Sequence, residues 1–129
     1  MPWQPNPNPS IMERKAALLL DEGDLLYLTE FSFPDLKSER GIPLRFDFAV
    51  FENPWDMEAE RPKFLLELQG EQHFKQKFQT REQFARQQAN DKRKRNYCSA
   101  KGYVLVAIPY TEYNTMTLDS ILEQGHYFD

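Results

Sequence analysis

Apolar side chains recur along several stretches of the chain with a period of two, and this period predicts β-strands. Residues 25–33 are expected to form a first strand that ends at Pro34. A polar turn then leads to a second strand at residues 44–51. The period divides that strand into two faces, Leu44, Phe46, Phe48 and Val50 on one and Arg45, Asp47, Ala49 and Phe51 on the other.

Two more strands are expected further along the chain. Residues 63–69 place Glu67 and Gln69 on one face and apolar side chains on the opposite face. Residues 103–108 are apolar throughout and end before Pro109, a pattern typical of a strand buried on both faces. An acidic, proline-containing loop is expected at residues 52–62.

Helical spacing and capping signals predict three helices. Ser10 and Glu13 form the Ser-x-x-Glu pattern of a capping box, so the first helix is expected to begin at Ser10 and end near Gly23. Residues 74–101 predict a long helix, closed by Gly102, with an uneven apolar stripe of Phe78, Phe84, Ala85, Tyr97 and Cys98. A short helix is expected at residues 117–123.

The predicted order is helix, three strands, helix, strand and helix, which indicates an α/β fold with a mixed central sheet flanked by helices. A chain of 129 residues is long enough for one domain. Because four of the nine prolines lie in residues 1–9, this stretch is expected to be an extended arm, followed by a single domain at residues 10–129.

Composition narrows the class of protein. Hydrophobic residues make up 40% and charged residues 28%, as in globular domains. The longest apolar runs are far shorter than the about 20 residues of a membrane span, and the first residues lack the features of a secretory leader. We therefore expect a cytoplasmic protein with no membrane partner. The single cysteine excludes an internal disulfide and a cysteine-based zinc site.

The net charge is −4, but the basic residues are concentrated in one segment. Residues 75–95 contain eight basic and two acidic residues, a net charge of +6, which leaves −10 on the rest of the chain. This asymmetry is typical of a phosphate-facing element on an acidic body; a solvated helix face is the alternative interpretation. The basic residues that we expect to contact nucleic acid are Lys75, Lys77, Arg81, Lys92, Arg93 and Arg95.

Two carboxylates interrupt the apolar strands. Asp47 lies between Phe46 and Phe48, and Glu67 lies between Leu66 and Leu68. Carboxylates are rare in core strands unless they are paired or bind a metal. On neighbouring strands they would meet at one sheet edge and bind Mg²⁺, with the Leu68 carbonyl as a further ligand. For each carboxylate taken alone, exposure on a half-solvated sheet is the simpler interpretation.

Polar residues that suit acid–base chemistry follow Glu67 directly. Gln69 shares its face and is placed to position a water molecule. The glycine turn at Gly70 brings His73 back towards the same strand end, where an imidazole can move a proton near neutral pH. Asp91 is the single acid in the run at residues 90–95 and either holds the imidazole or reduces repulsion between the neighbouring cations.

These motifs resemble a known family. The segments Arg-Phe-Asp-Phe (45–48), Leu-Leu-Glu-Leu-Gln-Gly-Glu-Gln-His-Phe (65–74), the Asn-Asp that precedes four basic residues (90–95) and Gly-Tyr-Val-Leu-Val-Ala-Ile-Pro-Tyr (102–110) are similar to the very-short-patch-repair-like branch of the PD-(D/E)xK nuclease superfamily. That branch includes phage homing endonucleases with a Glu-Asp-x-His-Asp signature. The resemblance covers residues 10–110 and implies a restriction-endonuclease-like αβββαβ core.

The resemblance also implies roles for individual residues. Asp47 would be the central metal-binding aspartate and Glu67 the acid paired with it. His73 would act on the attacking water or the leaving group, and Asp91 would orient it. Glu13 would be the first-helix glutamate beside the metal, although the capping box explains it equally well. Lys92, Arg93 and Arg95 would lie near the phosphates.

The function implied is a Mg²⁺-dependent DNA endonuclease, with Mn²⁺ as the expected substitute. The chain departs from many relatives at Gln69, where they carry an aspartate, and this change is expected to weaken metal affinity. The first alternative is therefore a catalytically inactive nuclease-like module that binds DNA or assembles with proteins. The second alternative is a structural protein-interaction domain. Specificity for a DNA target sequence would come from loop 52–62, the arm, a second copy of the chain in a homodimer, or another protein.

Overall fold

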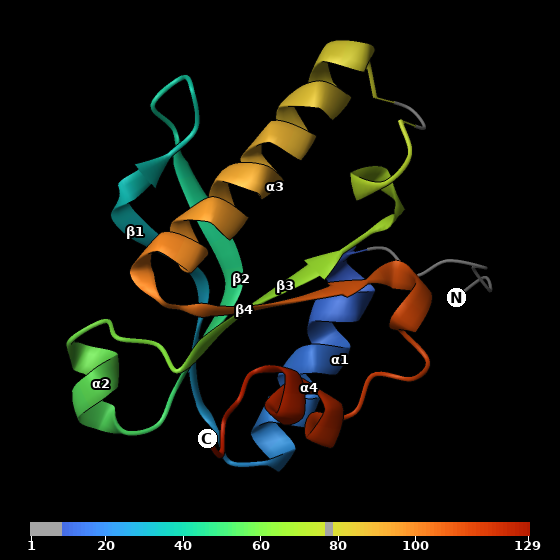
Figure 1. Ribbon diagram of the computed structural model, residues 1–129. Coiled ribbons are helices and arrows are strands. Elements are labelled where there is room, and N and C mark those ends of the chain that lie inside the picture. The colour runs from blue at the N-terminus through green and yellow to red at the C-terminus, as the bar shows by residue number, and fades with distance from the viewer. Residues whose placement is uncertain (1–8, 77–78) are drawn as a thin grey trace.

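The computed structural model describes residues 9–76 and 79–129, and it confirms an α/β fold with a four-stranded mixed sheet flanked by helices (Figure 1). The predicted arm up to residue 8, together with Lys77 and Phe78, lies outside the described residues, as does the side chain of Ser10. The elements in chain order are α1 (Pro9–Glu22), β1 (Leu26–Lys37), β2 (Pro43–Phe51), α2 (Pro54–Glu58), β3 (Phe64–Gln69), η1 (Glu71–His73), α3 (Arg81–Lys101), β4 (Val104–Pro109), η2 (Tyr110–Glu112) and α4 (Leu118–Gln124).

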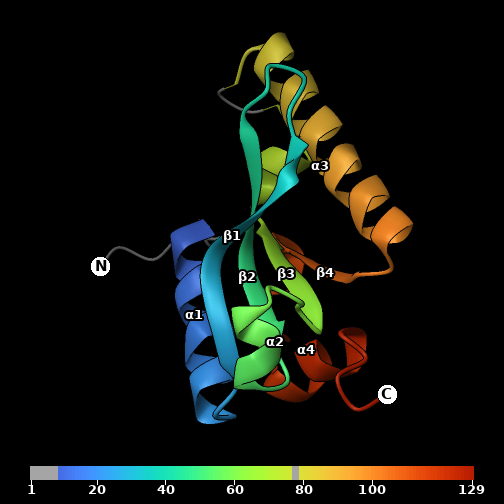
Figure 2. The ribbon, with the colours of Figure 1, turned by 90° about the vertical axis from the view of Figure 1, so that its left-hand side faces the viewer.

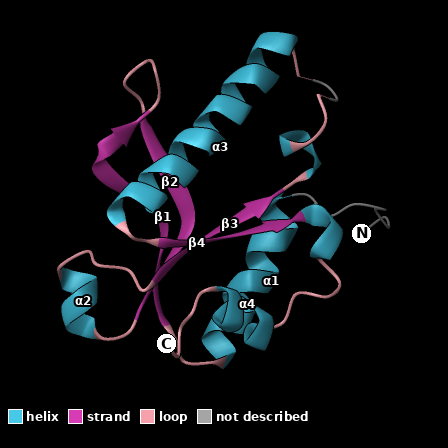
Figure 3. Cartoon of the chain, viewed as in Figure 1, coloured by secondary structure: helices cyan, strands magenta, loops and turns pink. Residues whose placement is uncertain are grey.

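The strands lie in the order β1-β2-β3-β4 (Figure 3). The pairs β1–β2 and β2–β3 are antiparallel, whereas β3 and β4 are parallel and are connected through α3. Figure 2 shows α1 on one side of the sheet and α3 on the other. An antiparallel pair needs only a turn, but a parallel pair needs a crossover, which explains why the long helix stands between β3 and β4.

Each face of the sheet carries its own apolar cluster. The first, the α1-side cluster, joins α1 and α4 to the sheet through Met12, Ala16, Leu20, Phe48, Val50, Phe64, Leu66, Leu68, Val106, Ile108, Met116, Ile121 and Leu122. The second, the α3-side cluster, consists of Phe31, Phe33, Leu36, Leu44, Phe46, Ala49, Phe51, Leu65 and Cys98. As predicted, Phe64, Leu66 and Leu68 share one face of β3.

The faces predicted for the second strand were wrong. Leu44 and Phe46 belong to the α3-side cluster, whereas Phe48 and Val50 belong to the α1-side cluster. The alternation therefore shifts at Asp47. The alternation of β1 shifts at the same level. Glu30 lies opposite Asp47, between the pairs Thr29–Phe48 and Phe31–Phe46. It has a left-handed backbone with φ of 48°, which explains the shift. Asp47 thus lies where the strand pair passes from one core to the other.

Two strand predictions also needed correction. β1 does not end at Pro34 but continues to Lys37, with a shift of register between Ser32 and Lys37. A proline is tolerated there because β1 is an edge strand and the missing N–H removes no necessary hydrogen bond. The last strand, β4, is also an edge strand, and Ala107 is exposed, so burial on both faces was wrong.

The helices differ from prediction mainly at their beginnings. The long helix begins at Arg81 instead of residue 74, because Thr80 and Gln83 form a capping box there. Its predicted end is confirmed, since Gly102 closes it with φ of 79°. The expected loop at residues 52–62 contains the short helix α2, capped by the Asn53 side chain. No helix among the described residues is long and apolar enough to cross a membrane.

Candidate functional site

Backbone pairing between β2 and β3 ends at Phe48–Leu66. Beyond this pair, side-chain carboxylates accept the hydrogen bonds that the backbone N–H groups donate between the two strands. The Asp47 N–H donates a hydrogen bond to Glu67 Oε1 at 3.1 Å. In return, the Leu68 N–H donates to Asp47 Oδ2 at 2.8 Å. Each strand therefore supplies an acid that accepts from the backbone of the other. This exchange holds both carboxylates at the point where the two strands separate, as expected from their positions on neighbouring strands.

Glu67 is buried and has a positive partner on α3. Its side chain is 8% exposed, and its Oε2 accepts a hydrogen bond from Lys94 Nζ at 3.2 Å. Burial raises the pKa of Glu67 from its ordinary value of 4.5 to about 7, although Lys94 opposes the increase. The carboxyl group is therefore poised between its charged and neutral forms near neutral pH, with both oxygens already engaged.

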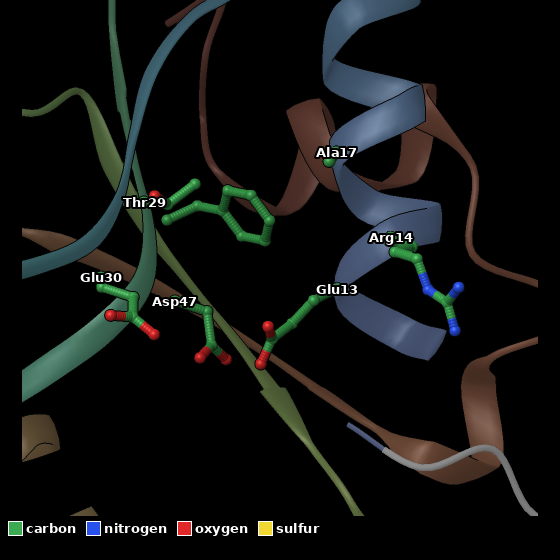
Figure 4. Close-up of a pocket in the computed structure, with 7 residues that line it drawn as sticks. Glu13, Arg14, Ala17, Thr29, Glu30 and Asp47 are labelled. Carbon is green, nitrogen blue, oxygen red and sulfur yellow. The ribbon is translucent and has the colours of Figure 1, made fainter. Parts of the chain in front are cut away.

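Asp47 has a second acidic neighbour, Glu13 of α1. Figure 4 shows the Glu13 carboxylate pointing towards Asp47, with Glu30 on the opposite side and Arg14 directed away. Burial raises the pKa of Glu13, and the charge of Asp47 raises it further. Burial also raises the pKa of Asp47, against the Leu68 N–H and the positive side chain of Lys94. These residues line an open hollow of about 570 Å³.

His73 and Asp91 form the third pair of the site. His73 lies in η1, and its Nδ1 is 2.9 Å from Asp91 Oδ2 on the buried side of α3. Their side chains are 14% and 11% exposed. An ionised carboxylate only accepts hydrogen bonds, so Nδ1 carries the hydrogen and the opposite nitrogen, Nε2, is left to accept a proton. Both side chains line a hollow of about 370 Å³ that also includes Lys94.

The structure thus brings together Glu13, Asp47, Glu67, His73 and Asp91, although they come from five separate segments. Lys94 connects them, because it binds Glu67 and lines the hollow of the imidazole. Leu68 contributes its N–H to Asp47, while its side chain lies in the α1-side cluster. Gln69 is half-buried at the end of β3.

Five of the six predicted phosphate-contacting residues lie in the described part of the chain, where they are exposed but do not form one row. Lys75 follows η1 and pairs with Glu71 at 3.4 Å. Arg81, Lys92, Arg93 and Arg95 are all exposed on α3. At about 100° per residue, Arg93 and Arg95 lie on opposite sides of that helix. Lys77 lies outside the described residues.

Sequence reasoning missed Lys94, which it counted only as one more cation in a basic run. The signal was present in the helical period. Gln87, Asp91, Lys94 and Cys98 follow at spacings of three and four, and they form the inward stripe of α3. Of the apolar stripe that had been predicted, Ala85 is exposed, so that assignment was wrong. A polar residue on the inward stripe of a helix needs a buried partner, and Glu67 is that partner.

No group of three or more His, Cys, Asp or Glu side chains within the described ranges is arranged to hold a metal ion. The pair of Glu13 and Asp47 nevertheless has the chemistry that Mg²⁺ requires. Mg²⁺ is commonly held by one or two carboxylates, with water and substrate phosphates as the other ligands. Burial raises the pKa of both acids, and the negative charge of Asp47 raises that of Glu13 further, so a cation bound between them would stabilise their charged forms.

The arrangement therefore combines paired acids for a cation, a half-buried lysine and an oriented imidazole where β2 and β3 separate. Compared with known proteins, the chain matches no family model, no curated protein sequence and no solved structure.

Proposed function

We propose that the protein is a metal-dependent DNA endonuclease that hydrolyses phosphodiester bonds. The observation that carries the proposal is the meeting of three ionisable pairs, Glu13–Asp47, Glu67–Lys94 and His73–Asp91, where β2 and β3 separate. Ionisable pairs at a hollow surface are typical of hydrolytic sites, and here the carboxyl groups of Glu13, Asp47 and Glu67 have raised pKa values.

The order of elements supports the same proposal. Without the short helix α2 and the turns, the chain runs α1, three strands, α3 and β4, and we propose that this is a restriction-endonuclease-like core. The two central strands, β2 and β3, bring Asp47 and Glu67 together where their backbone pairing ends. The helix before them supplies Glu13, and the helix after them supplies Lys94 and Asp91.

Glu13 and Asp47 would hold Mg²⁺ or Mn²⁺, with water and phosphate oxygens as the remaining ligands. The bound cation would stabilise charge on the scissile phosphate and acidify a water molecule. Glu67 was expected to be a metal ligand, but its two oxygens are engaged by the Asp47 N–H and by Lys94. We therefore propose that Glu67 holds Asp47 and Lys94 in position, and the Leu68 carbonyl remains a candidate ligand.

The other residues have roles that follow from their contacts. Asp91 orients His73 so that Nε2 accepts or returns a proton. Lys94 is a half-buried cation beside the carboxylates, so it stabilises negative charge that develops on the phosphate. The exposed cations of α3 bind the DNA backbone, which gives salt-sensitive affinity but little sequence information.

The first prediction is that the protein nicks or cuts plasmid DNA in the presence of Mg²⁺ or Mn²⁺ and that Asp47→Ala abolishes the cleavage. Asp119→Ala, which removes an exposed carboxylate on α4, is the matched control and is expected to cleave like the wild type. Agarose electrophoresis of the plasmid measures both. Equal cleavage by wild type and Asp47→Ala, or no cleavage by either, contradicts the proposal.

The engagement of Glu67 by Lys94 favours a second candidate, a nuclease-like module that binds DNA or assembles with proteins without catalysis. In that case the acids do not bind a cation. Calorimetric titration with Mn²⁺ separates the two candidates, because the nuclease is expected to release or absorb heat that Asp47→Ala lacks. Salt-dependent DNA binding without a metal signal favours the inactive module.

A further inference from the structure

A third hollow, of about 270 Å³, lies on the other side of α3 from Arg95. It is formed between the turn that joins β1 to β2 and residues 86–93 of α3, and the turn and this helix lie side by side in Figures 1 and 2. Three arginines line it, Arg40 from the turn and Arg86 and Arg93 from the helix. We refer to these three residues and the hollow between them as the arginine notch.

Three arginines and one acidic residue, Glu39, line the hollow, so its net charge is positive. All three arginines are exposed, and within the described residues none of their side chains has an ion pair or a hydrogen bond. By contrast, Arg45 is paired with Glu30 and Arg61 with Asp56. The chain carries 20 acidic residues against 16 basic ones, so three unpaired guanidinium groups around one hollow are available to an external anion.

Both walls of the notch are held in place. The turn is closed by Ser38 N–H donating to Ile42 O at 2.8 Å and Gly41 N–H donating to Ser38 O at 2.9 Å. On the helix, Arg86 and Arg93 are seven residues apart, so they lie on the same side with a separation of about 10 Å along the axis. Ala89 lies between them in the lining of the hollow, and its small side chain leaves space there for a ligand.

The notch continues into the candidate site. Arg86 and Asn90 line both the arginine notch and the hollow that contains His73, Asp91 and Lys94. An extended ligand bound in the notch could therefore continue along α3 to the oriented imidazole. A guanidinium group binds phosphate oxygens through two parallel hydrogen bonds, which makes arginine the residue suited to a phosphodiester backbone.

We propose that the arginine notch binds the phosphate backbone of the DNA strand that enters the candidate site, with the β1–β2 turn contacting the strand opposite α3. This inference rests on the proposed function, since the strand leads to the site at which that function would act. It assigns Arg40 and Arg86 to DNA binding and separates Arg93 from Lys92 and Arg95, which face other directions.

Fluorescence anisotropy with a labelled DNA duplex, in EDTA to prevent cleavage, tests the notch. Arg40→Gln, Arg86→Gln and Arg93→Gln are each expected to weaken binding about threefold to tenfold at about 100 mM salt and to reduce the salt slope by about one. Arg61→Gln, an exposed arginine paired with Asp56 on α2, is the matched control and is expected to bind like the wild type. Glu39→Gln removes a negative charge from the notch and is expected to tighten binding about twofold.

A neutral methylphosphonate linkage, moved one position at a time along the DNA, distinguishes direct contact from general attraction. When the neutral linkage is at a contacted position, the wild type is expected to bind the modified DNA more weakly than unmodified DNA. The triple variant Arg40→Gln/Arg86→Gln/Arg93→Gln is expected to bind both DNAs with equal affinity. The proposal is overturned if no position shows this dependence, if the notch variants bind like Arg61→Gln, or if the wild type does not bind DNA.

The same proteins, supplied with Mg²⁺, separate the two proposals. If the wild type cleaves DNA and the notch variants bind and cleave DNA as well as the wild type does, the proposal for the notch is wrong and the nuclease proposal is supported. If the notch variants lose affinity as expected but the wild type does not cleave DNA, the nuclease proposal is wrong and DNA binding by the notch is supported.

Discussion

Glu67 carries a carboxyl group in a buried strand, and its surroundings govern when that group is charged. Lys94 and the Asp47 N–H stabilise the ionised form, while burial disfavours it by a larger amount. Because the pKa lies near 7 in the folded protein, the residue links the stability of the fold to pH. Its position between Asp47 and Lys94 means that the same proton affects the geometry of the candidate site.

The stability of the protein is predicted to fall as pH rises from 5 to 8, and Glu67→Gln is predicted to weaken this dependence. Glu67 has an ordinary pKa of 4.5 and a folded-state pKa of about 7, so the folded protein keeps a proton that the unfolded chain releases. The free energy of unfolding therefore decreases through this window, by on the order of 3 kcal/mol. Urea unfolding followed by circular dichroism at several pH values measures it.

Glu22→Gln removes an exposed carboxylate of α1 and is the control for that experiment. Its profile is expected to follow the wild type. Parallel profiles for the wild type and Glu67→Gln would mean that burial does not perturb this carboxyl group.

At the scale of elements, α3 is unusual because its inward stripe is largely polar. A helix of this kind gains less from apolar burial, so its ends and its side-chain contacts matter more. Thr80 and Gln83 cap its beginning, and Gly102 closes its end. Asp35 of β1 anchors the last turns by accepting a hydrogen bond from the Tyr97 hydroxyl at 2.6 Å and pairing with Lys101 at 3.3 Å.

Gly102→Ala is predicted to destabilise the protein by about 1–2 kcal/mol, because the residue has φ of 79°, in the left-handed region that alanine avoids. A Cβ atom at this position meets no atom within 4 Å, so the cost is due to the backbone alone. Gly102→Asn is the matched control and is expected to cost less, since asparagine tolerates this conformation. Urea midpoints that are equal for the two variants would contradict the explanation.

On the scale of the whole molecule, one sheet separates two apolar clusters. Leu65 and Leu66 are neighbours in β3, and both are fully buried, yet Leu65 faces the α3-side cluster and Leu66 the α1-side cluster. Since both clusters depend on the same strand, we expect the protein to unfold as one cooperative unit.

Leu65→Ala and Leu66→Ala are each predicted to lower the free energy of unfolding by about 2–5 kcal/mol, with one transition in urea. Hydrogen exchange is expected to distinguish them, because the cavities lie on opposite faces. Leu65→Ala should reduce protection mainly in α3, whereas Leu66→Ala should reduce it mainly in α1. Two separate transitions in either variant would show that the clusters unfold independently.

Much of the fold was predictable because helix and strand signals are local. The strands at Glu67 and Asp47, the end of the long helix at Gly102 and the final helix followed from period, glycine and capping patterns. The predicted beginning of α3 at residue 74 was wrong because the capping box of Thr80 and Gln83 starts the helix at Arg81. The faces of β2 were misassigned because Glu30, in the paired strand, adopts a left-handed backbone that a period of two does not reveal.

The amino-acid sequence by itself determined most of the helix and strand segments and which strand positions carry acids, since these features depend on neighbouring residues. Only the tertiary structure decided that Lys94 pairs with Glu67 and that Arg40 lines one hollow with Arg86 and Arg93. Each of these arrangements brings together residues that are far apart in the chain. They therefore depend on how the sheet twists and where each helix packs against it, which no local pattern contains.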